Sequence, residues 1–417
     1  MSNNFRTQVL SVQSLQVPVY MLKKVIAALL LLVVIAGCGT SSETVSTDSN
    51  SDEAAIDQNY WVYVGAESED LIHRIRFGPD GAEVENTTPV GEIFNKIEGP
   101  HGLAIDDDAE YLNFTTGHGE PDGKFWKMKP GPDEIVEDPI LLGRFPATVD
   151  VTPDGEYAFI VNFNLHGEMV PSTTSVVYLP DFYEVAQTEV GVMPHGSRIS
   201  PDGNYQYSGL MMDDLLVELD AISFEVNRYF NVAEGEEGPV EDHPYPHDEH
   251  AEGNMGMDNH MHEEMHQDPT CSPTWAQPST TGEHVYVACN ASDRVLEIDV
   301  EAWELSRTFE TGTGPYNIDI SPDNRTMVVT LKQGDGVEII DLESEEHTIL
   351  DSSTSVTHGV IISPDSRFAF VSVEGIGGEP GIVDVYDLQT KEKVDSVETG
   401  KQASGIDFWK MEPVRSE

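Results

Sequence analysis

The amino-acid sequence predicts an all-β protein, a seven-bladed β-propeller built from four-stranded antiparallel blades. Three observations predict this fold. A turn signature recurs at a spacing near 45 residues, alternating apolar segments flank each copy, and the two ends of the chain supply complementary parts of one blade. Four strands in a repeat of about this length are typical of propeller blades.

The recurrent turn reads Ser or Thr, Pro, Asp, and then Gly, Asn or Ser. Proline fixes φ at the first central position of a turn, and Asp, Asn and Gly tolerate the conformations that follow. One interval between copies is longer than the rest, which predicts an insertion of roughly 35 residues in a loop. The clear copies begin at Thr152, Ser200, Ser321 and Ser363, and weaker copies begin at Asp106 and Ser279.

Apolar residues alternate with polar ones on both sides of each turn, as expected for strands. The chain begins with three outer strands, between about Tyr60 and Val90, and ends with an inner strand at 405–409. These ends should join in one blade, because closure removes the free sheet edges of an open fan. Inner strands are expected to start near Gly102, Thr148, Gly196, Trp275, Asn317, Gly359 and Gly405.

The N-terminal region indicates export. Lys23 and Lys24 precede an apolar run at 25–36, which is typical of a secretory signal and too short for a membrane span. We therefore interpret residues 1–20 as a mis-called start and 21–37 as a signal peptide. Residues 38–58, rich in Ser, Thr, Asp and Glu, predict a disordered acidic tether, and 59–412 predict the propeller.

Ile35-Ala36-Gly37-Cys38 resembles the lipobox of bacterial lipoproteins. The resemblance implies that Cys38 becomes the acylated first residue of the mature protein. It also implies a membrane partner through the lipid anchor, with the protein at the periplasmic face of the outer membrane or at the cell surface.

The formal net charge is -53, from 75 acidic residues against 22 Lys and Arg. Such a surface repels nucleic acid and anionic lipid head groups, so neither is an expected partner. Concentrated salt would screen the self-repulsion, which favours a salt-loving source. The rival interpretation is an acidic surface that attracts a basic protein partner. We expect a monomer.

The blades resemble the YVTN (YncE-like) repeat propellers, a group that includes cytochrome d1-like and nitrous-oxide-reductase-like propellers. The resemblance covers nearly all of 58–410. It rests on the Ser-Pro-Asp-Gly turns, on second strands such as Phe368–Val371, and on third strands such as Val383–Leu388. It implies the fold and leaves the function open, because such propellers include binding proteins, enzymes and cofactor carriers.

The residue just before each inner strand should point into the central channel. Three of these seven residues are histidines, although the whole chain has only 14. Imidazole nitrogens converging on one axis would make a metal site. A solvated polar lining and a substrate-recognition surface are the alternatives. The seven residues are His101, Ala147, His195, Thr274, Tyr316, His358 and Ser404.

Loops between second and third strands should open on the same face, and they contribute His118, His166 and Met169. Imidazole with thioether is a ligand set that copper prefers, and imidazole alone suits zinc. Copper is therefore the first expected ion and zinc the second. Pro-His-Gly also resembles the copper-cluster propeller of nitrous oxide reductase. That family has seven histidines and a cupredoxin domain, which this chain lacks, so its activity is not implied.

The insertion, at about 233–270, is rich in His, Met, Asp and Glu. Such tracts bind soft or borderline metal ions with loose geometry, so we expect a secondary metal-gathering loop; a flexible acidic insert is the alternative. Cys271 and Cys289 should lie close together and form a disulfide at its base, with a thiolate ligand or two free thiols as alternatives. The loop histidines are His243, His247, His250, His260, His262 and His266.

Other catalytic signatures are missing from the sequence. It contains no Gly-x-Ser-x-Gly, His-Glu-x-x-His or phosphate-binding loop, and no Cys-x-x-Cys-His for covalent haem. The leading hypothesis is an exported, lipid-anchored propeller that binds a transition metal for handling, sensing or delivery. One alternative is an enzyme that uses the same histidine-lined central channel, either a lactonase-like hydrolase or a cofactor-dependent oxidoreductase. The other is a non-catalytic interaction scaffold.

Overall fold

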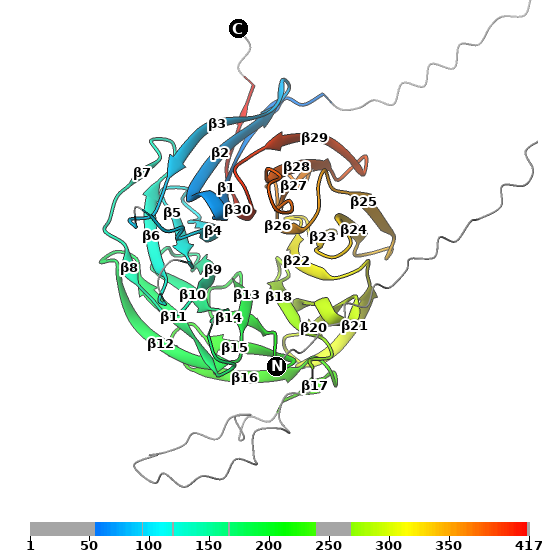
Figure 1. Ribbon diagram of the computed structural model, residues 1–417. Helices are drawn as coiled ribbons and strands as arrows, with labels where there is room; N and C mark the ends of the chain where they lie inside the picture. Colours follow the sequence, from blue (N-terminus) through cyan, green and yellow to red (C-terminus); the bar gives the residue numbers. More distant parts are fainter. Residues whose placement is uncertain (1–54, 94, 119–120, 166, 239–267, 415–417) are drawn as a thin grey trace, which may run out of the picture. The chain divides into compact units, whose positions relative to one another are not determined.

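The computed structural model describes residues 55–93, 95–118, 121–165, 167–238 and 268–414. These residues form seven small antiparallel sheets arranged as blades around a central axis, with two short 3-10 turns, Glu67–Glu69 and Asn290–Ser292 (Figure 1). The predicted seven-bladed β-propeller is confirmed. No helix in the described part of the chain is long and apolar enough to cross a membrane.

Each blade has its inner strand nearest the axis and its outer strand at the rim (Figure 1). The inner strands start about where the sequence predicts them. They are β4 (Pro100–Ile105), β9 (Pro146–Val151), β13 (Pro194–Ile199), β18 (Pro273–Pro278), β22 (Pro315–Ile320), β26 (Thr357–Ile362) and β30 (Ala403–Pro413).

The second strand of each blade pairs with the inner strand, and the third strand pairs with the second. The second strands are β5 (Leu112–Thr116), β10 (Tyr157–Asn162), β14 (Tyr205–Leu210), β19 (His284–Cys289), β23 (Thr326–Leu331), β27 (Phe368–Val373) and β1 (Gln58–Ala66). The third strands are β6 (Lys124–Lys129), β11 (Ser172–Tyr178), β15 (Leu215–Asp220), β20 (Arg294–Asp299), β24 (Gly336–Asp341), β28 (Ile382–Asp387) and β2 (Leu71–Gly78).

Two blades carry an additional two-residue strand at the outside. The outer strands are β7 (Glu134–Ile135) with β8 (Ile140–Leu141), β12 (Tyr183–Gly191), β16 (Val226–Asn231) with β17 (Glu236–Glu237), β21 (Glu304–Glu310), β25 (His347–Asp351), β29 (Glu392–Glu398) and β3 (Gly81–Pro89).

The hydrophobic core lies between neighbouring blades, because each sheet buries apolar side chains on both faces. One core cluster joins Tyr286 and Val295 of one blade to Ile318, Met327 and Ile340 of the next. Each blade is thus stabilised mainly by its two neighbours, so the ring depends on every blade being present.

The two ends of the chain share one blade, in the order β3-β2-β1-β30. Strand β30 pairs antiparallel with β1, with Val62 opposite Phe408 and Tyr63 opposite Asp407. Ser404 then donates a hydrogen bond of 2.7 Å from Oγ to the carbonyl of Pro100 in the first inner strand. The closure predicted from the sequence is confirmed.

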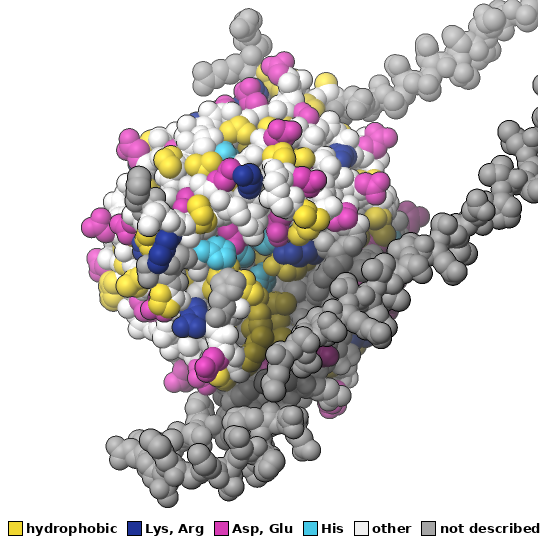
Figure 2. Space-filling view, viewed as in Figure 1, with side chains coloured by type: hydrophobic (Ala, Val, Ile, Leu, Met, Phe, Trp, Pro, Cys, Tyr) yellow, Lys and Arg dark blue, Asp and Glu magenta, His cyan; other side chains and the backbone are white. Residues whose placement is uncertain are grey.

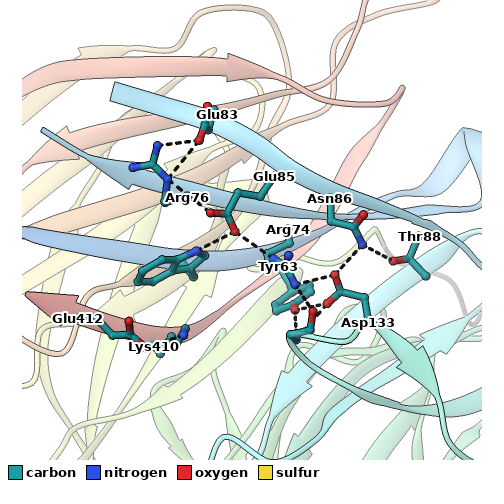
Figure 3. Close-up of polar contacts among 12 residues, drawn as sticks. Tyr63, Arg74, Arg76, Glu83, Glu85, Asn86, Thr88, Asp133, Lys410 and Glu412 are labelled. Carbon is teal, nitrogen blue, oxygen red and sulfur yellow. Dashed lines mark hydrogen bonds and ion pairs between the residues drawn. The ribbon is translucent and has the colours of Figure 1, made fainter. Parts of the chain in front are cut away.

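A polar network ties this closing blade to the next one (Figure 3). Asp133, in the turn between β6 and β7, is buried and accepts hydrogen bonds from Arg74 and Asn86, each at 2.6 Å, and from the hydroxyl of Tyr63. Arg74 also pairs with Glu85 at 3.2 Å. Removing one partner of such a buried pair would leave an uncompensated charge, so the pair holds the two blades together.

Three aspartates link adjacent inner strands near the axis. Asp150, Asp319 and Asp407 each accept a backbone N–H from the next inner strand, at 2.7, 2.7 and 2.6 Å. Burial raises the pKa of Asp319 to about 7 and that of Asp407 to about 6. These links recur at the fifth residue of an inner strand and hold neighbouring blades in register.

A disulfide joins Cys271, which precedes β18, to Cys289, which ends β19. Both residues are buried in the core cluster of this blade. The carboxylate of Asp214 accepts the backbone N–H groups of Thr270, Cys271 and Ser272 at 2.6–2.9 Å. Together these contacts anchor the chain where it returns from the insertion to the ring.

Candidate functional site: a histidine hub in a charged funnel

Four aromatic rings surround the axis at the start of the inner strands. We call them the hub ring: His101, His195, Tyr316 and His358. Successive ring centroids are 5.9, 5.2, 5.1 and 5.3 Å apart, going from His101 through His195, Tyr316 and His358 back to His101. All four side chains are at least 90 % buried. The three histidines of different blades therefore lie in one cluster of rings, as the propeller geometry predicts.

The backbone fixes the orientation of two of these imidazoles. His101 donates from Nδ1 to the carbonyl of Ala147 at 2.9 Å, and His195 donates from Nδ1 to the carbonyl of Thr274 at 3.0 Å. A carbonyl can only accept, so in the neutral ring Nε2 carries the free lone pair. Histidines that bind metal ions commonly have this arrangement, in which one nitrogen bonds to a backbone carbonyl and the other to the ion.

The fourth ring belongs to Tyr316, whose hydroxyl already makes a hydrogen bond within the hub ring. The hydroxyl of Tyr316 donates to Nε2 of His195 at 2.9 Å. An ion bound through Nε2 of His195 must displace this hydroxyl or bind beside it. Tyr316 stands at the same strand position as the three histidines and was not predicted as a ligand.

Burial keeps two of the three hub imidazoles, those of His195 and His358, uncharged. Burial, with His101 as the next cause, lowers the pKa of His195 to about 3. Burial, with Lys332 next, also lowers the pKa of His358 well below its usual value. Neutral imidazole is the form that binds a metal ion, so no proton has to leave these two rings at neutral pH.

The low pKa of His195 predicts acid sensitivity. An unfolded histidine titrates near pH 6.5. Between that value and about pH 3 the unfolded state therefore binds more protons, and stability falls as pH falls, by up to about 1.4 kcal/mol per pH unit for this group. A His195→Gln variant should lose less stability than the wild type between pH 6.5 and 4, measured by denaturant unfolding. Equal pH slopes would contradict the buried neutral imidazole; His347→Gln, on outer strand β25, is the control.

A second ring of side chains lies at the ends of the second strands, where the chain leaves the axis on the same face. The first residue after each of these strands is a recurrent position. Two are acidic and one is basic, in a chain where Lys and Arg are scarce. The seven residues are Glu67, Gly117, Phe163, Met211, Asn290, Lys332 and Glu374.

Glu67 is a buried carboxylate, 4 % exposed. It pairs through Oε1 with Nε2 of His118 and accepts a hydrogen bond from Gln402 at 3.1 Å. Although burial opposes ionisation, His101 and His118 hold the pKa of Glu67 below its ordinary value. His118 also packs edge-on against Phe145, with centroids 4.8 Å apart. Glu67 thus places a negative charge next to the hub.

Lys332 places a positive charge on the same face. We call the space between the hub ring and the charged residues Glu67, Lys332 and Glu374 the funnel. Nζ of Lys332 lies 2.9 Å from Oε1 of Glu374 and 4.0 Å from the centroid of the Tyr316 ring. Nε2 of His358 lies 4.0 Å from the same Glu374 oxygen. Burial opposes the positive charge of Lys332, but Tyr316 and Glu374 raise its pKa. The ammonium group of Lys332 is therefore protonated at neutral pH. Figure 2 shows histidines gathered in the hollow at the centre of this face, among apolar, acidic and basic side chains.

The three hub imidazoles are donors that suit a metal ion. Their nitrogens are not placed around a common point at bonding distance. Among the described residues, no group of three or more His, Cys, Asp or Glu side chains is arranged to hold an ion. Neighbouring centroids of the hub ring are 5.1–5.9 Å apart, Nε2 of His195 is held by the hydroxyl of Tyr316, and a bound imidazole nitrogen lies about 2 Å from zinc. Small side-chain shifts and release of the Tyr316 hydroxyl would therefore be needed.

The sequence-predicted site residues fall into three groups. The structure brings His101, His195 and His358 together, and places His118 beside them through Glu67 and Phe145. Met169 is 49 % exposed in the loop after β10, whereas the hub histidines are buried. The predicted residues that lie outside the described part of the chain are Cys38, His166, His243, His247, His250, His260, His262 and His266.

No protein-family model matches the chain, and no curated protein matches it in sequence. The fold is similar to that of several solved structures. Pseudomonas aeruginosa periplasmic gluconolactonase has a TM-score of 0.63 at 17% identity, over 84% of this chain and 99% of that chain. Kuenenia stuttgartiensis hydrazine synthase has 0.56 at 15% identity, over 78% and 99%. A functionally unknown protein from Desulfotomaculum acetoxidans has 0.59 at 14% identity, over 84% and 98%. At these identities the likeness shows the fold alone.

Proposed function

We propose that the hub binds a transition metal ion, copper first and zinc second, through Nε2 of His101, His195 and His358. The observation that carries the proposal is the convergence of three buried imidazoles from three separate blades on one axis. Backbone carbonyls orient two of them so that Nε2 is the nitrogen with the lone pair, which in His195 already accepts the hydroxyl of Tyr316. Imidazole suits both copper and zinc, and the neutral form requires no proton release.

The wider role is metal handling, sensing or delivery by an exported, lipid-anchored protein of the YVTN-like propeller group. The lipobox-like segment ending at Cys38 supports the anchor, and the repeat pattern supports the group. The acidic chain supports a high-salt environment. The His- and Met-rich insertion supports a gathering role for its six histidines, since such tracts bind soft metal ions loosely.

Metal titration of the tag-free full chain tests the hub site. Purified protein is titrated with copper and with zinc against a competing chelator, and bound metal is counted by elemental analysis. We expect His195→Ala to lower the number of tightly bound ions by one and to weaken hub binding at least about 100-fold, because one of three ligands is lost. His101→Ala and His358→Ala should do the same.

The control is His347→Ala, which removes a histidine that pairs with Glu338 far along the blade on β25. Circular dichroism confirms that each variant is folded. A wild type that remains metal-free after exposure to copper and zinc would refute the proposal. So would hub variants that bind as many ions as the wild type, because the insertion would then account for all binding.

A second candidate function is hydrolysis of a small ester or lactone at the same hub. The observation that favours it is the pairing of buried Glu67 with the partly exposed His118 beside His101, a carboxylate–imidazole arrangement suited to proton transfer. The similar fold of the gluconolactonase makes gluconolactone a reasonable first substrate. Turnover that Glu67→Gln abolishes, with Glu69→Gln unchanged, would establish an enzyme. If no lactone in a panel is hydrolysed, the hydrolase function is rejected and metal binding remains the proposed function.

A further inference from the structure

We infer that the central channel beneath the hub ring binds one water molecule, which links Asn317 to Arg198 across the axis. A cavity of about 20 Å³ lies there, lined by residues of all seven inner strands, among them His101 and His358 of the hub ring. A cavity needs about 10–15 Å³ to hold one water molecule, so this one accepts a molecule of that size and excludes a sugar or an organic cofactor. The inference goes beyond the proposed function, because this site requires no ion at the hub.

Asn317 supplies a hydrogen-bond acceptor that the fold leaves open. It is the third residue of β22 and is only 4 % exposed. Its backbone N–H donates to Oγ1 of Thr330 at 2.9 Å. Within the described part of the chain, however, its buried side-chain oxygen Oδ1 accepts no hydrogen bond. An unpaired buried amide oxygen is destabilising, and on the wall of a water-sized cavity it indicates an ordered water molecule as its donor.

Arg198 supplies donors to the same cavity. It is the fifth residue of β13, and its guanidinium carbon lies 4.6 Å from the centroid of the Trp275 ring. Nη1 donates one hydrogen bond to the carbonyl of Ser197 at 3.0 Å. A guanidinium has five N–H groups directed outward in its plane, so others remain for a water molecule. Because Arg198 and Asn317 line one small cavity, a water there can accept from the first and donate to the second.

Thr148 offers the third polar contact. Its hydroxyl donates to the carbonyl of His195, which leaves the oxygen free to accept a hydrogen bond, and the residue lines the cavity. Three hydrogen bonds are the usual number for a buried water molecule. A chloride ion is the competing occupant of similar size. It could accept from Arg198 but could not donate to Asn317 or Thr148, so the lining favours water.

The bridge replaces a link that this part of the ring lacks. In β9, β22 and β30, the fifth residue is an aspartate that accepts a backbone N–H from the next inner strand. Arg198 has this position in β13, but a guanidinium accepts no hydrogen bond. Arg198 instead stacks on Trp275 of β18, and the water carries the contact onward to Asn317 of β22. The inferred water therefore joins two blades across the one between them.

A double-mutant cycle tests the link in solution. Wild-type full chain, Asn317→Leu, Arg198→Met and the double variant are unfolded with denaturant. Because the bridge couples the two side chains, Asn317→Leu should raise the equilibrium constant for unfolding by a factor about three or more times larger in the wild type than in Arg198→Met. Arg228→Met is the matched control, because Arg228 lies in the same blade but pairs with Glu218 at 2.8 Å. In that background the effect of Asn317→Leu should match the effect in the wild type.

Diffraction from metal-free crystals, grown with chloride and separately with bromide, identifies the occupant. We expect one water molecule about 2.7–3.2 Å from Oδ1 of Asn317 and from a guanidinium nitrogen of Arg198, without an anomalous bromide peak. A bromide peak there would show an anion and overturn the inference. So would a wild-type map without density in the cavity, or equal effects of Asn317→Leu in the wild type and in Arg198→Met. If Arg198→Met does not fold, the wild-type maps decide alone. Failure of the hub to bind metal would refute the proposed function and leave this inference standing.

Discussion

Deletion of β30 is expected to unfold the propeller. A chain that ends at Gln402 loses the inner strand of the closing blade, and with it the partner of β1 along Gln58–Ala66. It also loses Ala403 and Ile406 from a core cluster. The link from Asp407 to the N–H of Ile105 disappears as well. We expect the combined cost to exceed the roughly 5–15 kcal/mol by which a native domain is stable, so no cooperative unfolding transition should remain.

Circular dichroism and thermal unfolding measure this effect. The matched control ends at Val414 and so retains all of β30 (Ala403–Pro413), and it should melt within a few degrees of the full chain. A chain ending at Gln402 that still showed a native spectrum and a cooperative transition near the wild-type temperature would contradict the closed ring. The blades would then have to be stable without their closure.

Gly196→Ala is expected to have the second-largest effect. Gly196 follows the hub histidine His195, and a Cβ there would lie 2.3 Å from the carbonyl oxygen of Thr274 and 2.5 Å from Cα of Trp275. Both atoms belong to the backbone of the next blade and cannot move independently. Overpacking of this kind costs about 1–3 kcal/mol or more. Because the Thr274 carbonyl also orients His195, the variant should bind metal more weakly as well.

Denaturant unfolding measures the loss of stability, and Gly378→Ala is the control. A Cβ at Gly378 would meet no atom within 4 Å, so that variant should be within about 0.5 kcal/mol of the wild type. Equal stabilities of the Gly196→Ala and Gly378→Ala variants would show that the blades do not approach as closely at the hub as the structure indicates.

The repeat made the fold predictable from the sequence. Six blades repeat the same turn and the same alternation, so aligning the turns located six inner strands and the residues that face the axis, and the strand at the C-terminal end supplied the seventh. His101, His195 and His358 could be predicted as neighbours for that reason, although 94 positions separate His101 from His195 in the chain. Closure of the ring by β30 could be predicted because the chain begins with three strands that lack an inner strand and ends with an inner strand that lacks the other three.

The charged part of the funnel was not predicted, for a physical reason. Acidic residues are so common here that Glu67 and Glu374 gave no signal above the background of 75. Whether a carboxylate is buried beside a histidine or solvated depends on the path of its loop, which the repeat does not define. Lys332 could have been found, because it is the one Lys or Arg among the seven residues that directly follow the second strands.

The role of Tyr316 could not be predicted from the sequence for a different reason. Its position on the hub was evident from the alignment, but its role depends on where the hydroxyl points. Only the structure shows that this hydroxyl bonds to Nε2 of His195 and that Lys332 lies over its ring. Hydrogen-bond direction at a converging site is set by side-chain rotamers, which strand periodicity does not specify.

Anomalous diffraction from crystals grown with copper, and separately with zinc, tests the central claim most directly. Data collected on both sides of the absorption edge of the metal would locate each bound ion. We expect one peak on the propeller axis, within bonding distance of Nε2 of His101, His195 and His358, with the Tyr316 hydroxyl displaced from His195. A map with peaks only at other histidines, or with no peak on the axis at saturating metal, would contradict the account.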